Sequence, residues 1–289
     1  MMRFGLFIVW LLHFLPLPLL AWAGQGLGML LYWFGRERRR VARTNLRLCF
    51  PQMTERTREQ LLRRHFRAFA RSLLERGIVW WSSAARIQKV VRIEGIEHWN
   101  AVRDKPVIWL APHFVGLDMG GVRLTTEFPL VSMYSRQKNP VVNALLLHSR
   151  SRFGMSHLVS RQDGIKPVIK TIKNGVPFYY LPDNDFGARD AVFVPFFNVP
   201  AATITGLSRL SKLTGAAVVP CVTRQLPGGG GYVVKFYPAW QDFPSNDVEA
   251  DTQRMNTFIE ERVLEMPEQY IWLHKRFKTR PPGEARFYE

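Results

Sequence analysis

The chain has 289 residues and is 47% hydrophobic, which is enough for a substantial core in one large domain or two small ones. Lys and Arg number 40 against 23 Asp and Glu, so the formal charge is +17. Such an excess favours acidic partners: nucleic acid, anionic lipid headgroups or an acidic protein. Cys49 and Cys221 lie far apart without metal-ligand spacing, which argues against a disulfide framework and against a zinc site. We interpret them as reduced thiols in or near the core.

The first notable feature is an apolar segment at residues 4–34, which carries no formal charge over 31 residues. Since about 20 apolar residues cross a bilayer, it is long enough to span one. Pro16 and Pro18 interrupt it. A kinked span, a re-entrant hairpin and an interfacial helix are therefore all compatible with the pattern.

A cleaved signal peptide is the competing interpretation, because Arg3 precedes the run and Ala21-Trp22-Ala23 resembles a cleavage site. Two features oppose it. The apolar run continues past Ala23, and arginines follow it closely: Arg36, Arg38, Arg39, Arg40, Arg43 and Arg47. This positive-inside pattern predicts an uncleaved membrane anchor at residues 1–35 and a cytoplasmic domain at residues 36–289.

The rest of the chain alternates predicted helices and strands. Apolar residues at three- and four-residue steps predict a helix at 54–81. Further helices are expected at 97–103, 116–127, 140–153, 164–174, 205–214 and 246–266, the last with Asn246 and Glu249 at capping-box spacing. Strands are expected at 90–93, 107–111, 130–134, 156–159, 178–182, 216–222 and 232–237. The alternation predicts an α/β fold: a mixed, largely parallel sheet flanked by helices, with an N-terminal membrane helix. No internal repeat is visible.

One strand end carries a candidate catalytic pair. The strand at 107–111 is followed by Pro112, His113 and, five residues after the histidine, Asp118. On one continuous helix, five residues would turn Asp118 about 140° away from His113. The pair can meet only if His113 lies in the loop and Asp118 in the first helical turn. Spacing alone is a weak signal, but a strand end followed by a turn is a common position for catalytic residues.

Other catalytic motifs are missing from the sequence. No G-x-S-x-G elbow, P-loop or G-x-G-x-x-G occurs, and no cysteine lies beside the motif histidine. A general base that acts on a substrate therefore remains: His113 would take a proton from a hydroxyl while Asp118 holds the other ring nitrogen. The hydroxyl would attack an activated acyl carbonyl, and backbone N–H groups near the helix start would stabilise the oxyanion.

Basic and acidic residues follow several of the predicted strands. Arg136 and Lys138, Arg161, and Arg189 each come after a strand, so their side chains are expected at one rim, where Arg suits phosphate. Taken singly, each is better explained as a solvated charge than as a binding residue. Within the polar turn at 183–189, Asp185 fits an Asx turn, whereas Asp183 fits either such a turn or a cation site.

These residues lie in segments that resemble a known family. His113-x4-Asp118 resembles the signature of glycerolipid acyltransferases, and the wider pattern resembles the lipid A biosynthesis lauroyl/myristoyl acyltransferases. The matching segments, which span nearly the whole chain, are APHFVGLDMG, YSRQKNP, YYLPDNDFGARDAVFVPFF, ATITGLSRLSKLTGAAVVP and QYIWLHKRFKTRPPGE.

The resemblance implies O-acylation of a hydroxyl on an acyl chain of a lipid A precursor at the bacterial inner membrane. The donor would be acyl-carrier protein or acyl-CoA, with no cofactor or metal and no nucleic-acid partner. His113 would be the base and Asp118 its partner, although many relatives have Glu there. Other residues in the matching segments would bind substrate or shape the site: Arg136, Asn139, Arg161, Asp183 and Arg189, with Trp272, His274, Arg276 and Arg280 either structural or facing substrate.

Two alternatives stay open at this point. In the first, the enzyme would acylate another membrane lipid, such as a lysophospholipid or an amino-acid lipid. In the other, the chain would be a membrane-tethered basic protein that binds nucleic acid or anionic lipid without chemistry.

Overall fold

The structure, a computed structural model, describes residues 2–288, with side chains from residue 5 onward. Its centre is a seven-stranded sheet of order β1-β9-β8-β2-β5-β3-β4, in which every neighbouring pair is parallel except β8 and β9. The strands are β1 (Val91–Glu94), β2 (Val107–Leu110), β3 (Leu130–Tyr134), β4 (Ser156–Ser160), β5 (Phe178–Tyr180), β8 (Ala217–Gln225) and β9 (Tyr232–Phe236). The predicted mixed, largely parallel α/β sheet is confirmed.

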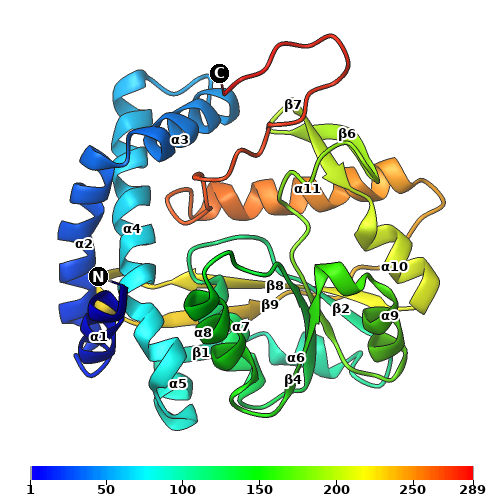
Figure 1. Cartoon of the computed structure of the whole chain (residues 1–289). Helices are drawn as coiled ribbons and strands as arrows, with labels where there is room; N and C mark the ends of the chain where they lie inside the picture. Colours follow the sequence, from blue (N-terminus) through cyan, green and yellow to red (C-terminus); the bar gives the residue numbers. More distant parts are fainter. Residues whose placement is uncertain (1, 289) are drawn as a thin grey trace.

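Helices cover both faces of this sheet, because the central strands are buried on both sides. Trp109 of β2 packs in a cluster with α5 (Ala84–Val90), α6 (Ile96–Asn100) and α7 (Leu117–Thr125). Its neighbours Ile108 and Leu110 point to the opposite face, as alternation in a strand requires. There they join α9 (Lys166–Lys173), α10 (Gly206–Thr214) and α11 (Val248–Glu265), and Figure 1 shows α11 running across that face.

Several structural elements, α5 among them, had no counterpart in the prediction. The arginine-rich stretch after the apolar segment forms α3 (Arg36–Cys49), whose buried face includes Val41, Leu46 and Cys49. The hairpin of β6 (Ala191–Phe196) and β7 (Val199–Ile204) turns at Phe197 and Asn198, both with positive φ. Positive φ at both turn residues usually requires glycine or Asn-Gly, so the sequence carried no clear hairpin signal.

Local details of other elements also differ from expectation. Asp247, not Asn246, caps α11 by accepting from the backbone N–H groups of Glu249 and Ala250.

The remaining elements are α8 (Pro140–Ser151), η1 (Arg161–Asp163) and η2 (Pro227–Gly229). Cys49 and Cys221 are free and buried, as expected.

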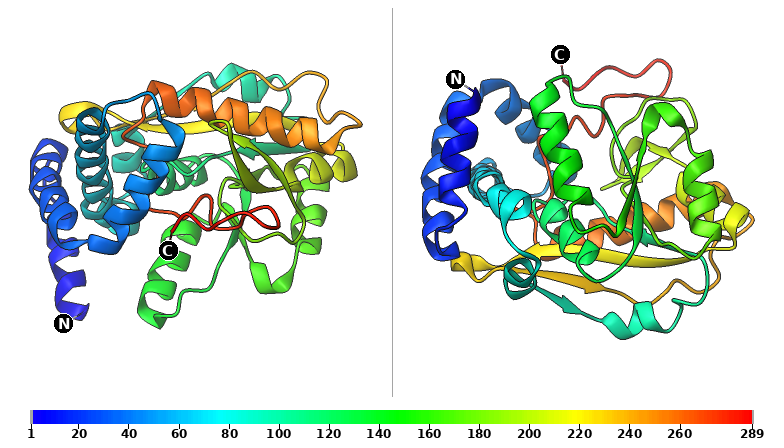
Figure 2. Two further views of the ribbon diagram at one scale, coloured as in Figure 1. Left: turned by 90° about the horizontal axis from the view of Figure 1, so that it is seen from above. Right: turned by 60° about the horizontal axis from the view of Figure 1, so that its bottom comes forward.

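The apolar N-terminal segment forms α1 (Met2–Leu12) and α2 (Leu17–Phe34), which lie beside α4 (Glu55–Trp81) at one side of the sheet (Figures 1 and 2). Among the described residues, α2 alone is long and apolar enough to cross a membrane. A Cβ on Gly24 or Gly28 would lie 2.6 or 2.5 Å from the Cα atoms of Arg71 and Arg67. Glycine is therefore required where α2 meets α4, because the two backbones touch.

Candidate active site

The loop that carries His113 is fixed by the C-terminal segment. β2 ends at Leu110, and His113 lies in the loop before α7, as expected. The N–H of Val115 donates to the carbonyl of Gln269 at 2.8 Å, and the N–H of Ile271 donates to the carbonyl of His113 at 3.0 Å. These bonds hold the loop at the histidine and directly after it, and 15% of the His113 side chain remains exposed.

Asp183 holds the imidazole of His113. It follows β5, and its Oδ1 lies 2.7 Å from Nδ1, while its Oδ2 accepts from the backbone N–H of His113 at 2.9 Å. Burial by itself would raise the pKa of this carboxyl, but the charge and two hydrogen bonds of His113 outweigh burial and lower it to about 2. The ionised carboxylate can only accept, so Nδ1 carries the proton and Nε2 presents its lone pair.

The expectation that Asp118 holds the other ring nitrogen is therefore wrong for this structure. Asp118 does lie in the first turn of α7, but its carboxylate is directed to two arginines: Arg76 of α4 at 3.2 Å and Arg150 of α8 at 3.0 Å. Burial opposes its ionisation, yet the charges of these arginines hold its pKa below the usual value, with a weaker contribution from His113. Asp118 thus acts on the imidazole through space and not through a hydrogen bond.

The order of strands in the sheet explains why Asp183, and not Asp118, bonds to His113. β2 and β5 are adjacent and parallel, with Leu110 paired to Tyr180. Their carboxyl ends therefore bring His113 and Asp183 together, although 70 residues separate them in the sequence. Spacing along one segment cannot reveal a contact that strand order creates.

The other ring nitrogen of His113 has a partner that sequence reasoning missed. The side-chain amide nitrogen of Asn184 lies 3.1 Å from Nε2, and the amide oxygen lies 2.5 Å from Nδ1 of His274. Burial, followed by the charge of His113, lowers the pKa of His274 to about 4, so this ring is neutral near pH 7. The only sequence signal was position: Asn184 follows Asp183, and His274 lies in one of the segments with family resemblance.

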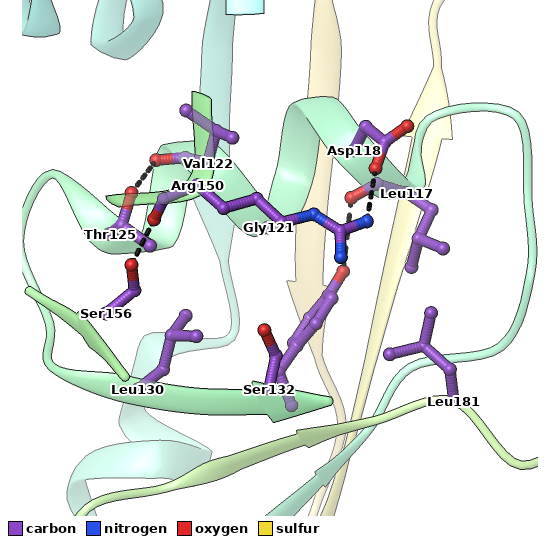
Figure 3. Close-up of a pocket in the computed structure, with 11 residues that line it drawn as sticks. Leu117, Asp118, Gly121, Val122, Thr125, Leu130, Ser132, Arg150, Ser156 and Leu181 are labelled. Carbon is purple, nitrogen blue, oxygen red and sulfur yellow. Dashed lines mark hydrogen bonds and ion pairs between the residues drawn. The ribbon is translucent and has the colours of Figure 1, made fainter. Parts of the chain in front are cut away.

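A pocket opens beside Asp118, at the start of α7 (Figure 3). His113, Asp183, Asn184 and His274 do not line it. Its cavity volume is about 30 Å³, and its lining includes the apolar Leu117, Val122, Leu130 and Leu181. Figure 3 shows Arg150 extending along the pocket to Asp118, so the ion pair forms part of the wall. The pocket is mainly apolar, with charge concentrated at one end.

The remaining predicted substrate-binding residues lie after the carboxyl ends of strands, but no described hydrogen bond links them to His113. Arg136 is exposed, and Arg189 is 97% exposed. Asn139 caps α8 by accepting from the N–H groups of Val141 and Val142. The guanidinium of Arg161 lies 4.1 Å from the ring centroid of Phe186.

Residues around the site support its walls. Asp185 accepts from the N–H of Gly187, the expected Asx turn, and also from Thr279. Arg276 is buried and donates to the carbonyl of Ala202 and the hydroxyl of Thr203. Trp272 is buried in the core, and Arg280 donates to the carbonyl of Pro200. Within the described residues, no group of three His, Cys, Asp or Glu side chains is arranged to hold a metal.

Comparison with known proteins gives this geometry a context. Residues 1–279 match the family described as bacterial lipid A biosynthesis acyltransferase. The chain is 36% identical to the lipid A biosynthesis lauroyltransferase of Escherichia coli K12, over 98% of this chain and 93% of that protein. It is 31% identical to the palmitoleoyltransferase of the same organism, over 99% and 93%.

Among solved structures, a 1-acyl-sn-glycerophosphate acyltransferase from Thermotoga maritima aligns with a TM-score of 0.39 and 15% identity, over 80% of this chain and 96% of that one. The assignment of family depends on the sequence matches, which cover nearly the whole chain. The chain belongs to the bacterial lipid A biosynthesis acyltransferase family and is an O-acyltransferase.

Proposed function

We propose that this enzyme transfers a fatty acyl chain from acyl-carrier protein to a hydroxyl on an acyl chain of a lipid A precursor, a late acylation step. The names of its relatives support the acceptor class. The charge of +17 supports it as well, since a phosphorylated glycolipid and an acidic carrier protein would both be attracted. Acyl-CoA is the other thioester donor to be tested.

His113 acts as the general base in this proposal. The acceptor hydroxyl gives its proton to Nε2 while its oxygen forms a bond to the thioester carbonyl carbon. The resulting tetrahedral intermediate collapses with cleavage of the carbon–sulfur bond. The protonated ring then returns the proton to the departing thiolate, and the ester product forms without any cofactor.

The two carboxylates have different roles. Asp183 orients the imidazole and stabilises its charged form, since it is buried and bonded to Nδ1 at 2.7 Å. Asp118 keeps a catalytic role through its field on the imidazolium, and it fixes Arg76 and Arg150 at the pocket. Both carboxylates therefore favour proton transfer to His113, but only Asp183 sets which nitrogen receives the proton.

In this proposal the acyl chain of the donor enters at the pocket of Figure 3, which widens to admit it beyond its cavity volume of about 30 Å³. Its lining combines leucine and valine side chains with the buried hydroxyl-bearing Ser132. Asp118 belongs to both this lining and the surroundings of His113, so a chain in the pocket would place its carboxyl end near the base. Apolar walls suit an alkyl chain, because burial of each methylene contributes about 0.8 kcal/mol.

The sugar and phosphates of the acceptor bind at the rim formed by the carboxyl ends of the parallel strands. Arg136, Arg161 and Arg189 follow β3, β4 and β5, and the side chains of Arg136 and Arg189 are exposed there. Guanidinium groups bind phosphate in a forked geometry. Asn139 and Asp183 shape this region, the first through its cap on α8 and the second through His113.

Residues 1–35 bring this site to the inner membrane, with residues 36–289 in the cytoplasm. The outward face of α1, α2 and the turn between them exposes large apolar side chains: Phe7, Trp10, Phe14, Trp22, Leu30, Trp33 and Phe34. Both ends of α2 lie against the acyltransferase domain, Pro18 beside Gly229 and Gly35 beside Phe66. A helix crossing the bilayer would carry one end away from such a domain, so this packing supports an interfacial position in one leaflet.

The observation that carries this proposal is the hydrogen bond of buried Asp183 to His113 at the end of β2. The test compares wild-type and His113→Ala proteins in acyl transfer from a defined acyl-carrier protein to a purified lipid A precursor. We expect the variant to fold and to lose transfer. Full transfer by a folded His113→Ala protein would remove the base from the mechanism.

A second measurement identifies the acceptor. Mass spectrometry of lipid A from cells that lack this protein should show a precursor short of one acyl chain. Unchanged lipid A, together with transfer to another membrane lipid, would instead support the alternative acceptor. A protein that binds anionic lipid and transfers no acyl chain would be the non-catalytic alternative.

A further inference from the structure

The hydrogen bonds around His113 form one directed chain of four side chains. Asp183 accepts from Nδ1 of His113 at 2.7 Å, and Nε2 of His113 accepts from the amide of Asn184 at 3.1 Å. The amide oxygen of Asn184 accepts from Nδ1 of His274 at 2.5 Å. His113 and Asn184 each donate one bond and accept one, His274 donates at one end, and the ionised Asp183 accepts at the other and fixes the direction.

This arrangement places Asn184 at the atom that must accept the proton. As long as its amide donates to Nε2, no substrate hydroxyl can occupy that position. When the hydroxyl arrives, the Asn184 amide nitrogen moves off Nε2, and the bond of its amide oxygen to His274 keeps it close to that position. The free Asn184 N–H then lies beside the attacking hydroxyl oxygen. This oxygen bonds to the thioester carbonyl carbon, so the carbonyl oxygen on that carbon comes within reach of the same N–H.

We propose that Asn184 is a further catalytic residue, whose amide N–H covers Nε2 of His113 in the free enzyme and donates to the oxyanion during acyl transfer. His274 is its positioning residue. This inference rests on the proposed role of His113 as the base. It assigns the oxyanion donor to a side chain and not only to backbone N–H groups near the start of α7.

His274 is suited to positioning and not to proton transfer. Its ring lies 5.4 Å from that of His113, measured between centroids, and the Asn184 amide links Nε2 of His113 to Nδ1 of His274. A neutral His274 with its proton on Nδ1 donates to the Asn184 oxygen, so the amide cannot rotate without loss of this bond. A flipped amide would turn its oxygen toward the lone pair of Nε2, and the two acceptors would repel each other.

The experiment measures kcat and KM for acyl transfer by the full-length enzyme. Asn184→Ala should lower kcat about 100-fold, the usual cost of one lost oxyanion donor, with donor KM changed by less than about twofold. Asn184→Asp removes the amide donors at constant size and should also lower kcat, which covers the case in which the alanine variant does not fold. Asn100→Ala, at the exposed end of α6, is the matched control and should keep wild-type kcat.

The positioning role of His274 has its own readout. His274→Leu should lower kcat, whereas His274→Asn should restore most of it, since an asparagine amide nitrogen can replace Nδ1 as the donor. In the Asn184→Ala background, His274→Leu should have little further effect, because it acts through the missing amide. Multiplicative losses in the double variant would overturn the positioning role.

Failure of this inference is distinguishable from failure of the proposed function. Wild-type kcat in both Asn184→Ala and Asn184→Asp, with an inactive His113→Ala protein, would overturn the role of Asn184 and leave the base in place. A fully active His113→Ala protein would overturn both. A raised KM with unchanged kcat in the Asn184 variants would also overturn it, because an oxyanion donor acts on kcat.

Discussion

The most informative test compares Asp183→Asn with Asp118→Asn. Asp183 is 1% exposed and accepts from both the ring and the backbone N–H of His113. An amide at this position must turn its NH2 group toward one of these two donors. The repulsion between two facing donors is removed when the proton of the His113 ring moves from Nδ1 to Nε2. That tautomer cannot act as the base. We expect kcat to fall by about 10⁴-fold, as for the equivalent change in a serine-protease triad.

Asp118→Asn should have a much smaller effect. The Asp118 side chain is 36% exposed, and its partners Arg76 and Arg150 are 40% and 25% exposed. Partly exposed ion pairs of this kind contribute about 1 kcal/mol or less each. With the lost field on the imidazolium, we expect a decrease in kcat of about tenfold, which corresponds to about 1.4 kcal/mol in the barrier.

The assay is single-turnover and steady-state acyl transfer from a purified acyl thioester to a phosphorylated glycolipid. Thermal unfolding of each variant serves as the folding control, because Asp183→Asn also removes a buried charge. The reverse order, with Asp118→Asn the more damaging, would refute this reasoning. It would mean that Asp118 takes the ring nitrogen in the working enzyme.

Three further predictions concern the pocket, the core and α2. Ser132→Leu, which fills the pocket, should shift donor preference toward shorter chains by about fourfold in kcat/KM per methylene, while exposed Ser151→Leu should not. Burial lowers the pKa of His65 from 6.5 to about 4, so the folded protein binds fewer protons than the unfolded chain. The free energy of unfolding should therefore fall by about 3 kcal/mol as pH drops through this window, and His65→Gln should flatten the dependence in denaturant titrations. Gly28→Leu should lower the free energy of unfolding by about 1–3 kcal/mol, because its side chain would meet the α4 backbone, whereas Gly26→Leu meets open space and should be neutral; equal effects would contradict the packing of α2.

The sequence by itself determined the elements whose signals are local. Apolar periodicity gave the long helix α4 and the strands of the sheet, since burial of one face imposes that pattern. His113 was also identifiable, because a histidine directly after a buried strand and Pro112 occupies a recognisable local position. Residue spacing could not have found Asn184 or His274, which reach His113 from other segments.

The tertiary structure alone decided which carboxylate holds the histidine. Asp118 was near in sequence, but α7 directs it to arginines on α4 and α8. Asp183 was distant in sequence, but β5 lies next to β2, so their carboxyl ends meet. The order of strands is a global property of the packed core, and a pattern within one segment does not contain it. The same holds for α2, whose composition permits a membrane span while its glycines press it against α4.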